Sequence, residues 1–240
     1  LTVVRELMRQ LPDEDIIYFG DTARVPYGPK SPETVNRYAH EITAYLQDQG
    51  VKNVVVACNT ATAHAVESLR EHFDLPITGV IEPGARAAVR ASDAHSIGVL
   101  GTQGTISSGA YERAIHALDA DAHVVARACP LFVPFVEEGW LDHPAIELVA
   151  HDYLSTLRDT DIDTVVLGCT HYPLIKPVIA RAVGPDMRAR PFHAACGDRP
   201  HGNVRGDRRF AAPRGQRRDR VRMAEADGQV IEAVRVVPDL

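Results

Sequence analysis

Two short apolar segments end in nearly the same motif, and this repetition is the strongest constraint on how the chain folds. The first reads VVVACNTATA over residues 54–63, and the second reads VVLGCTHYPL over residues 165–174. In each copy a run of β-branched and small apolar residues, typical of a buried parallel strand, leads into a cysteine. Ligand sites of open α/β sheets lie at the carboxyl ends of strands, so Cys58 and Cys169 are predicted to stand at such a site.

Two thiols that face each other across a cleft have the arrangement that a racemisation by two bases needs. One thiolate removes a proton from one face of a carbon acid, and the other thiol delivers a proton to the opposite face, so no cofactor is required. A free thiol has a pKa of about 8.5, so the site must lower that value or desolvate the thiolate to make it basic. Backbone N–H groups of residues 59–61, and those from Thr170 onward, are predicted to stabilise thiolate or substrate carboxylate at helix N-termini.

The rest of the chain alternates between predicted strands and helices. A strand ends near Asp21, and Ser31 with Pro32 begins a helix that stops before Gly50. Further strands are predicted at 53–57, 77–80, 96–102, 123–130 and 164–170, and further helices at 1–12, 61–73, 82–92, 109–118, 143–157 and 174–183. Such alternation indicates parallel βαβ units. We therefore predict an α/β fold of two similar α/β/α half-domains whose mainly parallel sheets face a shared cleft.

Composition excludes several classes of protein. The chain has 240 residues, 45% of them hydrophobic, which is enough for one large core or two smaller ones. Its apolar runs are far shorter than the roughly 20 residues that a bilayer requires, and no secretion signal is recognisable, so a cytoplasmic protein is expected. The four cysteines are irregularly spaced, as in reduced cytosolic proteins, and the chain lacks C-x-x-C and H-x-x-x-H pairs. No metal site is predicted.

Charge is distributed unevenly along the chain. The formal net charge is −6, but residues 188–222 are rich in arginine and the remainder is strongly acidic. An acidic bulk disfavours nucleic acid or an anionic membrane as the main partner. The arginine-rich tract has no hydrophobic period, and we interpret it as the product of compensating frameshifts. The alternative is a basic insert that binds nucleic acid.

Lysine usage argues against a pyridoxal cofactor. The three lysines, Lys30, Lys52 and Lys176, stand in no context typical of a Schiff base. The segment GTQGTISSG at 101–109 lies at a predicted strand-to-helix turn but lacks the spacing of a nucleotide-binding loop. Its Thr102 and Thr105 are instead expected to line the substrate cleft.

Five blocks in order carry a resemblance to a known family. They are YFGDTARVPYG (18–28), ACNTATA (57–63), GVIEPG (79–84), CPLFVPFVEEG (129–139) and GCTHYPL (168–174). In these blocks the chain resembles the glutamate racemases of the aspartate/glutamate racemase superfamily, over residues 1 to about 187 and again in the last twenty or so. The resemblance implies a cytoplasmic, cofactor-independent homodimer that interconverts L- and D-glutamate and supplies D-glutamate for peptidoglycan. It also implies two domains, 1–81 with 190–240 and 82–189.

The resemblance also implies roles for particular residues. Cys58 would deprotonate D-glutamate and Cys169 L-glutamate, while the supporting catalytic residues would be His171, Glu137 and Asp21. Substrate-binding residues implied by the same blocks are Tyr27, Gly28, Asn59, Thr60, Thr170 and His171.

Two departures from the family pattern lead to further expectations. The family has a short strand and an Asp-Ser-Gly-rich loop before the segment that matches Leu1, so this chain is expected to be an N-terminally truncated form. The second departure is the arginine-rich tract. Aspartate is the alternative substrate, and a catalytically silent binding or regulatory protein on the same scaffold is the alternative from another class.

Overall fold

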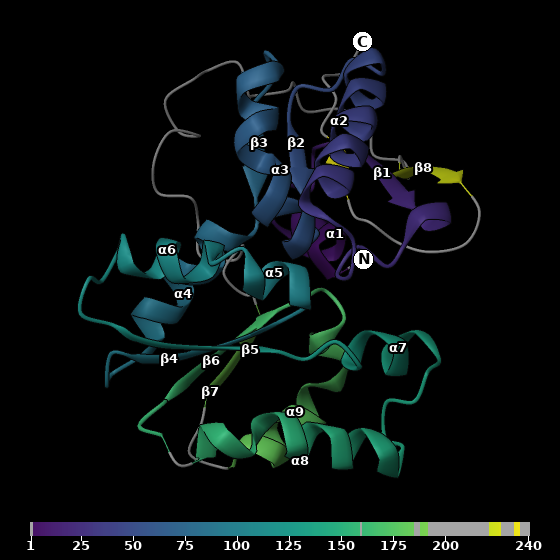
Figure 1. Ribbon diagram of the computed structural model, residues 1–240. Helices are drawn as coiled ribbons and strands as arrows, with labels where there is room; N and C mark the ends of the chain where they lie inside the picture. Colours follow the sequence, from purple (N-terminus) through teal and green to yellow (C-terminus); the bar gives the residue numbers. More distant parts are fainter. Residues whose placement is uncertain (1, 159, 185–187, 192–220, 227–232, 236–240) are drawn as a thin grey trace.

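The computed structural model describes residues 2–158, 160–184, 188–191, 221–226 and 233–235 (Figure 1). Most of the arginine-rich tract, with Cys196, and much of the C-terminal segment lie outside these residues, so their interpretation stays a prediction. None of the described helices combines the length and apolar character that crossing a lipid bilayer requires.

The first sheet has five strands in the order β3-β2-β9-β1-β8. Strands β1 and β8 are parallel, as are β2 and β3, whereas β9 lies antiparallel between β1 and β2. The elements of this part, in Figure 1 mostly purple and blue, are α1 (Thr2–Gln10), β1 (Ile16–Asp21), η1 (Thr22–Arg24), α2 (Pro32–Asp48), β2 (Val54–Val56), α3 (Asn59–His72), β3 (Ile77–Gly79), β8 (Val221–Ala226) and β9 (Ala233–Arg235).

The second sheet has four strands, all parallel, in the order β5-β4-β6-β7. Its elements, teal and green in Figure 1, are α4 (Ile81–Ala91), β4 (Ser96–Gly101), α5 (Gln103–Ser107), α6 (Ala110–His116), β5 (His123–Ala128), α7 (Phe132–Glu137), α8 (Pro144–Arg158), β6 (Thr164–Gly168), η2 (Tyr172–Ile175), α9 (Lys176–Val183) and β7 (Arg188–Pro191). The predicted α/β fold class is therefore confirmed, with two mainly parallel sheets.

Each sheet is packed between helices on both faces. In the first, apolar residues of α2 and α3 cover one face and those of α1 cover the other. In the second, α8 and α9 pack on one face and α4 and α6 on the other. Each fully buried aliphatic or aromatic side chain in these layers contributes roughly 1.5–3 kcal/mol by leaving water. Burial of β6 along its whole length explains its unbroken apolar sequence.

Local sequence explains several of the helix boundaries. Ser31 caps α2 by accepting a hydrogen bond from the backbone N–H of Thr34, with Pro32 at the first helical position. Gly50 follows that helix with φ of 72°, a conformation that favours glycine. Helix α3 begins at Asn59, two residues before its predicted start, because Cys58 itself serves as the cap. The short helices α5 and α7 were not predicted, since neither is long enough to show a period.

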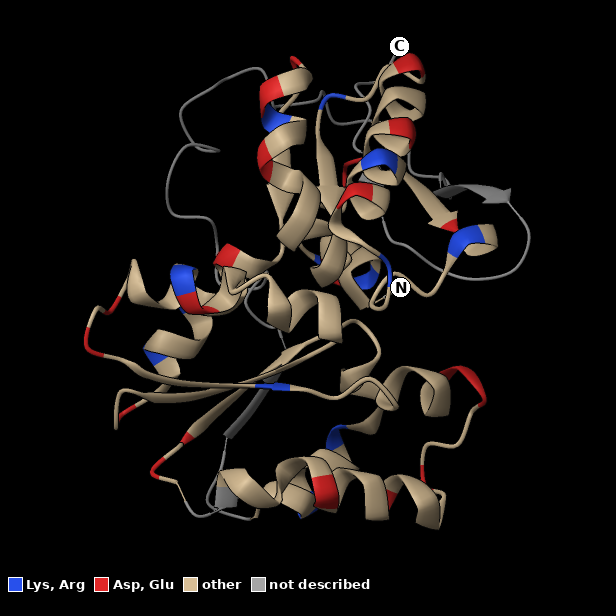
Figure 2. Ribbon diagram, in the orientation of Figure 1, with Lys and Arg blue, Asp and Glu red and all other residues tan. Residues whose placement is uncertain are grey.

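Strand register places the ends of three parallel strands at one edge of the second sheet. Gly101 at the end of β4 pairs with Gly168 of β6 and with Ala128 of β5. The residues that follow these strand ends therefore come together at that edge, as parallel sheets require. Acidic and basic residues, by contrast, are interspersed on the outer helices α2 and α3 (Figure 2).

Candidate active site

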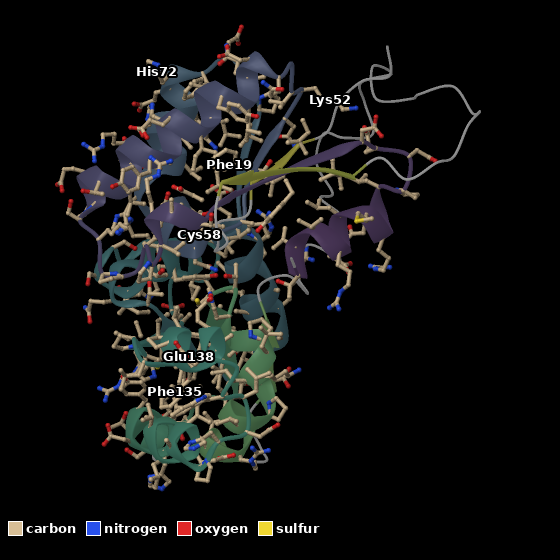
Figure 3. All side chains as sticks on the ribbon, turned by 90° about the vertical axis from the view of Figure 1, so that its right-hand side faces the viewer. Phe19, Lys52, Cys58, His72, Phe135 and Glu138 are labelled. Carbon is tan, nitrogen blue, oxygen red and sulfur yellow. The ribbon has the colours of Figure 1, made fainter. Side chains whose placement is uncertain are left out.

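A cavity of about 200 Å³ lies where the two sheets meet, and it is lined from both. Figure 3 shows Cys58 at this junction, between the upper and lower halves of the molecule. Among the predicted site residues, those that line the cavity are Tyr27, Gly28, Cys58, Asn59, Thr60, Glu137, Cys169, Thr170 and His171. The structure therefore brings both thiols of the repeated motif to one cavity, one from each sheet.

Cys58 stands at the N-terminus of α3, directly after the first apolar strand of the repeated motif. Its sulfur accepts a hydrogen bond from the backbone N–H of Ala61 at 3.5 Å, so the thiol is the helix cap. Enclosure by protein raises the pKa of the Cys58 thiol, while hydrogen bonds from Ala61 and Thr60 oppose that rise. The expected stabilisation of a thiolate by helix N–H groups thus has a geometry here, although burial has the larger effect.

Cys169 follows β6 and is only 6% exposed. Burial raises the pKa of this thiol to about 12, against backbone hydrogen bonds from His171 and Tyr172 that lower it. Cys58 raises it as well, because two thiolates in one cavity would repel each other. Burial is therefore the largest influence on the pKa of this thiol, and a desolvated thiolate is a stronger base than one in water.

His171 links the second thiol to a carboxylate. Its Nδ1 lies 3.6 Å from the sulfur of Cys169 and 3.2 Å from Oγ1 of Thr170. Its Nε2 is hydrogen-bonded to Oε1 of Glu137, which α7 carries to this point from 34 residues away. Since a carboxylate accepts, Nε2 is the donor of this pair, and a ring with a single proton leaves Nδ1 as an acceptor toward the thiol.

Asp21 lies outside the cavity lining, in contrast to the other predicted site residues. It is 2% exposed, and its carboxylate accepts hydrogen bonds from Tyr27 Oη and from Arg24 Nε. Arg24 is held in turn by Glu41 and by the ring of Tyr38, which lies 4.2 Å from the guanidinium carbon. Asp21 therefore contacts the cavity only through Tyr27, whose pKa is raised by burial and by this hydrogen bond.

The loop that carries Tyr27 and Gly28 is fastened to the second half of the molecule. The backbone N–H of Gly104 donates to the carbonyl of Gly28 at 2.9 Å. A Cβ on Gly28 would lie 2.7 Å from Cβ of Thr102, closer than real Cβ atoms come, so glycine is required by this close approach. A Cβ on Gly104 would lie 2.9 Å from the Gly28 carbonyl oxygen, and the same reasoning applies.

Three threonine hydroxyls form a closed triangle across the junction. Thr60 Oγ1 lies 2.8 Å from Thr102 Oγ1 and 3.1 Å from Thr105 Oγ1, and the latter two are 3.1 Å apart. All three residues are buried, and the triangle gives each hydroxyl hydrogen-bond partners away from water. Thr102 lines the cavity as expected, whereas Thr105, which was also expected to line it, is absent from the lining and contacts it through the hydroxyls of Thr60 and Thr102.

The cavity has contributors that the sequence did not single out. They include Gln103, Pro130, Val133 and Pro134. Pro130, Val133 and Pro134 belonged to a recognised block, and apolar wall residues carry no chemical signature of their own. Among the described residues that line the cavity there is no lysine or arginine, so these residues would hold an anionic ligand mainly through neutral donors. Within the described ranges, no three His, Cys, Asp or Glu side chains are grouped so as to hold a metal ion.

Chemically, the cavity offers two thiols, one from each half of the molecule, together with neutral hydrogen-bonding groups among the residues that line it. The thiols follow strands of different sheets and line the same cavity, so a small molecule bound there lies near both. This arrangement suits proton removal and proton delivery at a single carbon.

Comparison with known proteins shows the family to which the chain is related. Residues 2–189 match the model of the family described as Asp/Glu/Hydantoin racemase. A glutamate racemase from Geobacter metallireducens is 54% identical over 188 residues, which are 78% of this chain and 70% of the relative. The crystal structure of a glutamate racemase from Bacillus anthracis superposes with a TM-score of 0.78 at 42% identity, over 82% of this chain and 74% of the other.

A second solved structure includes a ligand. The glutamate racemase from Francisella tularensis, crystallised in complex with D-glutamate, superposes with a TM-score of 0.76 at 40% identity. The match covers 82% of this chain and 73% of that protein.

Proposed function

Because the chain belongs to the Asp/Glu/Hydantoin racemase family, we propose that it is an amino-acid racemase that interconverts L- and D-glutamate without a cofactor. The observation that carries this proposal is the convergence of Cys58 and Cys169 on one cavity from two strand ends. Relatives more than half identical to this chain bear the name glutamate racemase, which favours glutamate over aspartate as the substrate.

The proposed reaction moves one proton at each face of the substrate α-carbon. With D-glutamate, the Cys58 thiolate takes the Cα proton, the electron pair remains on the substrate as a carbanion stabilised by its carboxylate, and the Cys169 thiol donates its proton to the opposite face. L-glutamate leaves, with Cys58 now a thiol and Cys169 a thiolate. The reverse reaction starts from that state, so charge and protons balance over each turnover.

His171 and Glu137 assist the second thiol in this scheme. Nδ1 of His171 faces the Cys169 sulfur at 3.6 Å and can take the thiol proton when the thiolate is needed. Glu137 fixes the tautomer by accepting from Nε2, and it stabilises the imidazolium that forms. Asp21 acts as a positioning residue, because it reaches the cavity through Tyr27.

Substrate binding is assigned to Tyr27, Gly28, Asn59, Thr60, Thr170 and His171. All six line the cavity, and most offer a hydroxyl, an amide or a backbone N–H group. In the described part of the structure, Nδ2 of Asn59 is buried without a hydrogen-bond partner. A buried donor of this kind is costly unless a ligand satisfies it, and a glutamate carboxylate would do so.

The wider setting of this activity is proposed from the same family membership. The enzyme would supply D-glutamate for peptidoglycan, act in the cytoplasm and form a homodimer. Its two domains would comprise residues 1–81 with 190–240, and residues 82–189. The first sheet contains β8 and β9 from the C-terminal segment, which supports this division.

The test is solvent deuterium incorporation at Cα of L- and D-glutamate, followed together with circular dichroism. It compares the unmodified protein with Cys58→Ser, Cys169→Ser and Cys129→Ser variants. Cys129 is the matched control, since it is a fully buried free thiol that does not line the cavity. We expect inversion with exchange in the unmodified protein and in Cys129→Ser, and its loss in the other two.

Other outcomes would contradict the proposal in different ways. Faster inversion of aspartate than of glutamate would reassign the substrate. Glutamate binding without exchange in the folded protein would indicate a catalytically silent binding protein. Equal activity in all three variants would remove the thiols from the mechanism.

A further inference from the structure

Tyr111 is a buried residue of the second half that reaches the substrate-binding residues of the first. It lies on α6 and is 2% exposed. Its hydroxyl donates to Oδ1 of Asn59 at 2.7 Å, across 52 positions of sequence and across the junction between the two sheets. Tyr111 does not itself line the cavity, so any effect on a ligand must pass through a neighbour.

This hydrogen bond determines what Asn59 presents to the cavity. The amide is 2% exposed, and its Oδ1 is occupied by Tyr111, while Nδ2 has no partner among the described residues. With the carbonyl end held, the N–H₂ end is the part of Asn59 left for a ligand. An N–H donor recognises an acceptor, and the acceptors of an amino acid at neutral pH are its carboxylate oxygens.

The ring of Tyr111 also touches the strand that ends at the other thiol. A Cβ added to Gly168 would lie 3.0 Å from Cε2 of Tyr111 and 2.8 Å from the carbonyl oxygen of Leu100. Glycine at position 168 therefore allows the ring to pack against β6 immediately before Cys169. One side chain thus contacts the residue after Cys58 and the residue before Cys169.

We propose that Tyr111 is a positioning residue. It orients the Asn59 amide as a donor toward the substrate carboxylate, and it fixes the relative position of the two strand ends that lead into Cys58 and Cys169. The identity of the ligand rests on the proposed function, whereas the orientation of Asn59 does not. A free asparagine amide can turn over and present either end. Without the tyrosine hydroxyl, Asn59 loses the contact that distinguishes its two orientations.

A double-mutant cycle tests this role. The variants are Tyr111→Phe, Asn59→Ala and the two together, and KM, kcat and the glutamate dissociation constant are measured for each. We expect Tyr111→Phe to raise KM and the dissociation constant roughly five- to tenfold, with a smaller change in kcat, as loss of one hydrogen bond to the substrate predicts. In the Asn59→Ala background the same substitution should change neither value further.

Tyr172→Phe is the matched control. Tyr172 is also fully buried, and its hydroxyl donates to a backbone carbonyl, that of Cys129, at 2.8 Å. Removing this hydroxyl makes the same chemical change near the same strand end without touching Asn59. Its effect on the glutamate dissociation constant should therefore be the same with and without Asn59.

Several results would overturn the role of Tyr111. Unchanged kinetics and affinity in folded Tyr111→Phe would do so, as would an effect of equal size in both Asn59 backgrounds, which would make Tyr111 a structural residue only. If the unmodified protein neither racemises nor binds glutamate, the proposed function fails while the positioning role is still tested. The side-chain ¹⁵N–¹H signals of Asn59 in the ligand-free protein should shift in Tyr111→Phe and remain near their original positions in Tyr172→Phe. Unshifted signals in Tyr111→Phe would refute the orientation.

Discussion

At the scale of single residues, the site contains two thiols whose pKa is raised by burial. Cys58 and Cys169 both have a raised pKa, and in both cases burial is the largest cause. The hydrogen-bond donors around each sulfur only partly oppose this effect. A thiolate formed in such surroundings is a stronger base than one in water, which is what proton removal from a weak carbon acid demands.

The first residue-scale prediction concerns pH. A thiol with a raised pKa keeps its proton at neutral pH. As long as pH lies below that pKa, each increase of one pH unit raises the thiolate fraction of the free enzyme about tenfold. The reaction needs one thiolate, and kcat/KM reports the free enzyme. We expect kcat/KM for glutamate to rise with a slope near one between about pH 6.5 and 8.5. A flat or falling profile over this interval would show that the thiolate already exists at neutral pH.

The second residue-scale prediction concerns the partner of His171. Glu137→Gln keeps a hydrogen-bond acceptor near Nε2 but removes the charge that stabilises an imidazolium. Because hydrogen bonds to charged groups are worth about 1–2 kcal/mol more than neutral ones, kcat/KM should fall roughly tenfold in both directions. The control is Glu138→Gln, the neighbouring carboxylate, which is exposed and does not line the cavity. Equal activity of the two variants would remove Glu137 from the mechanism.

At the scale of elements, loops and short helices form much of the cavity wall. Helix α7 carries Glu137 to His171, and α5 supplies the backbone N–H that holds the Gly28 carbonyl. These elements are short, so their positions depend on contacts with the rest of the molecule more than on their own propensity. Small changes at such contacts should therefore affect activity more than stability.

The element-scale prediction tests one such contact. In Gly28→Ala the new methyl would meet Thr102, so the loop that carries Tyr27 must move away. Overpacking of this kind typically costs about 1–3 kcal/mol, and we expect kcat/KM to fall by roughly tenfold or more. Gly20→Ala is the matched control, because its new methyl would make only an ordinary contact with Tyr18 at 3.4 Å. Kinetics and thermal unfolding are measured for both variants, and similar kinetics in both would contradict the close approach.

At the scale of the whole molecule, both α/β halves contribute residues to the wall of the cavity. Among the described free thiols, Cys129 and Cys169 are buried and Cys58 is half-buried, and burial raises the pKa of each. For Cys129 the pKa rises to about 12, as it does for Cys169. The free energy of unfolding is therefore expected to depend on pH in the alkaline range.

The sign of that dependence follows from proton binding. Between the unfolded pKa of about 8.5 and the raised folded pKa, the folded protein holds more protons than the unfolded chain, so the free energy of unfolding falls as pH rises. Below pH 8 this contribution is fully present. We expect urea unfolding midpoints to decline steadily above about pH 9, and to decline less steeply in Cys129→Ser, which lacks one buried thiol. An unchanged slope in that variant would show that Cys129 does not contribute.

Much of the fold was predictable because its signals are local. Ser31 with Pro32 marks the start of α2, and the unbroken apolar residues of β6 mark a strand buried on both faces. The thiol positions followed from the same reasoning, since a residue just after a parallel strand stands at the edge where sites form. Asp21 shows where this reasoning stops being sufficient. It lies at a strand end as predicted, but its carboxylate accepts hydrogen bonds from Tyr27 and Arg24 and does not line the cavity.

The sequence by itself determined the alternation of strands and helices, the cap that begins α2, and the placement of a thiol at the end of two strands. Each of these depends on residues within one or two turns of each other, so short-range sterics and hydrogen bonding suffice. Only the tertiary structure decided that β9 lies antiparallel between β1 and β2, that Glu137 meets His171, and that Tyr111 holds Asn59. Those contacts join segments far apart in the chain: the first forms within one sheet, the second within the second half, and the third across the junction of the two halves.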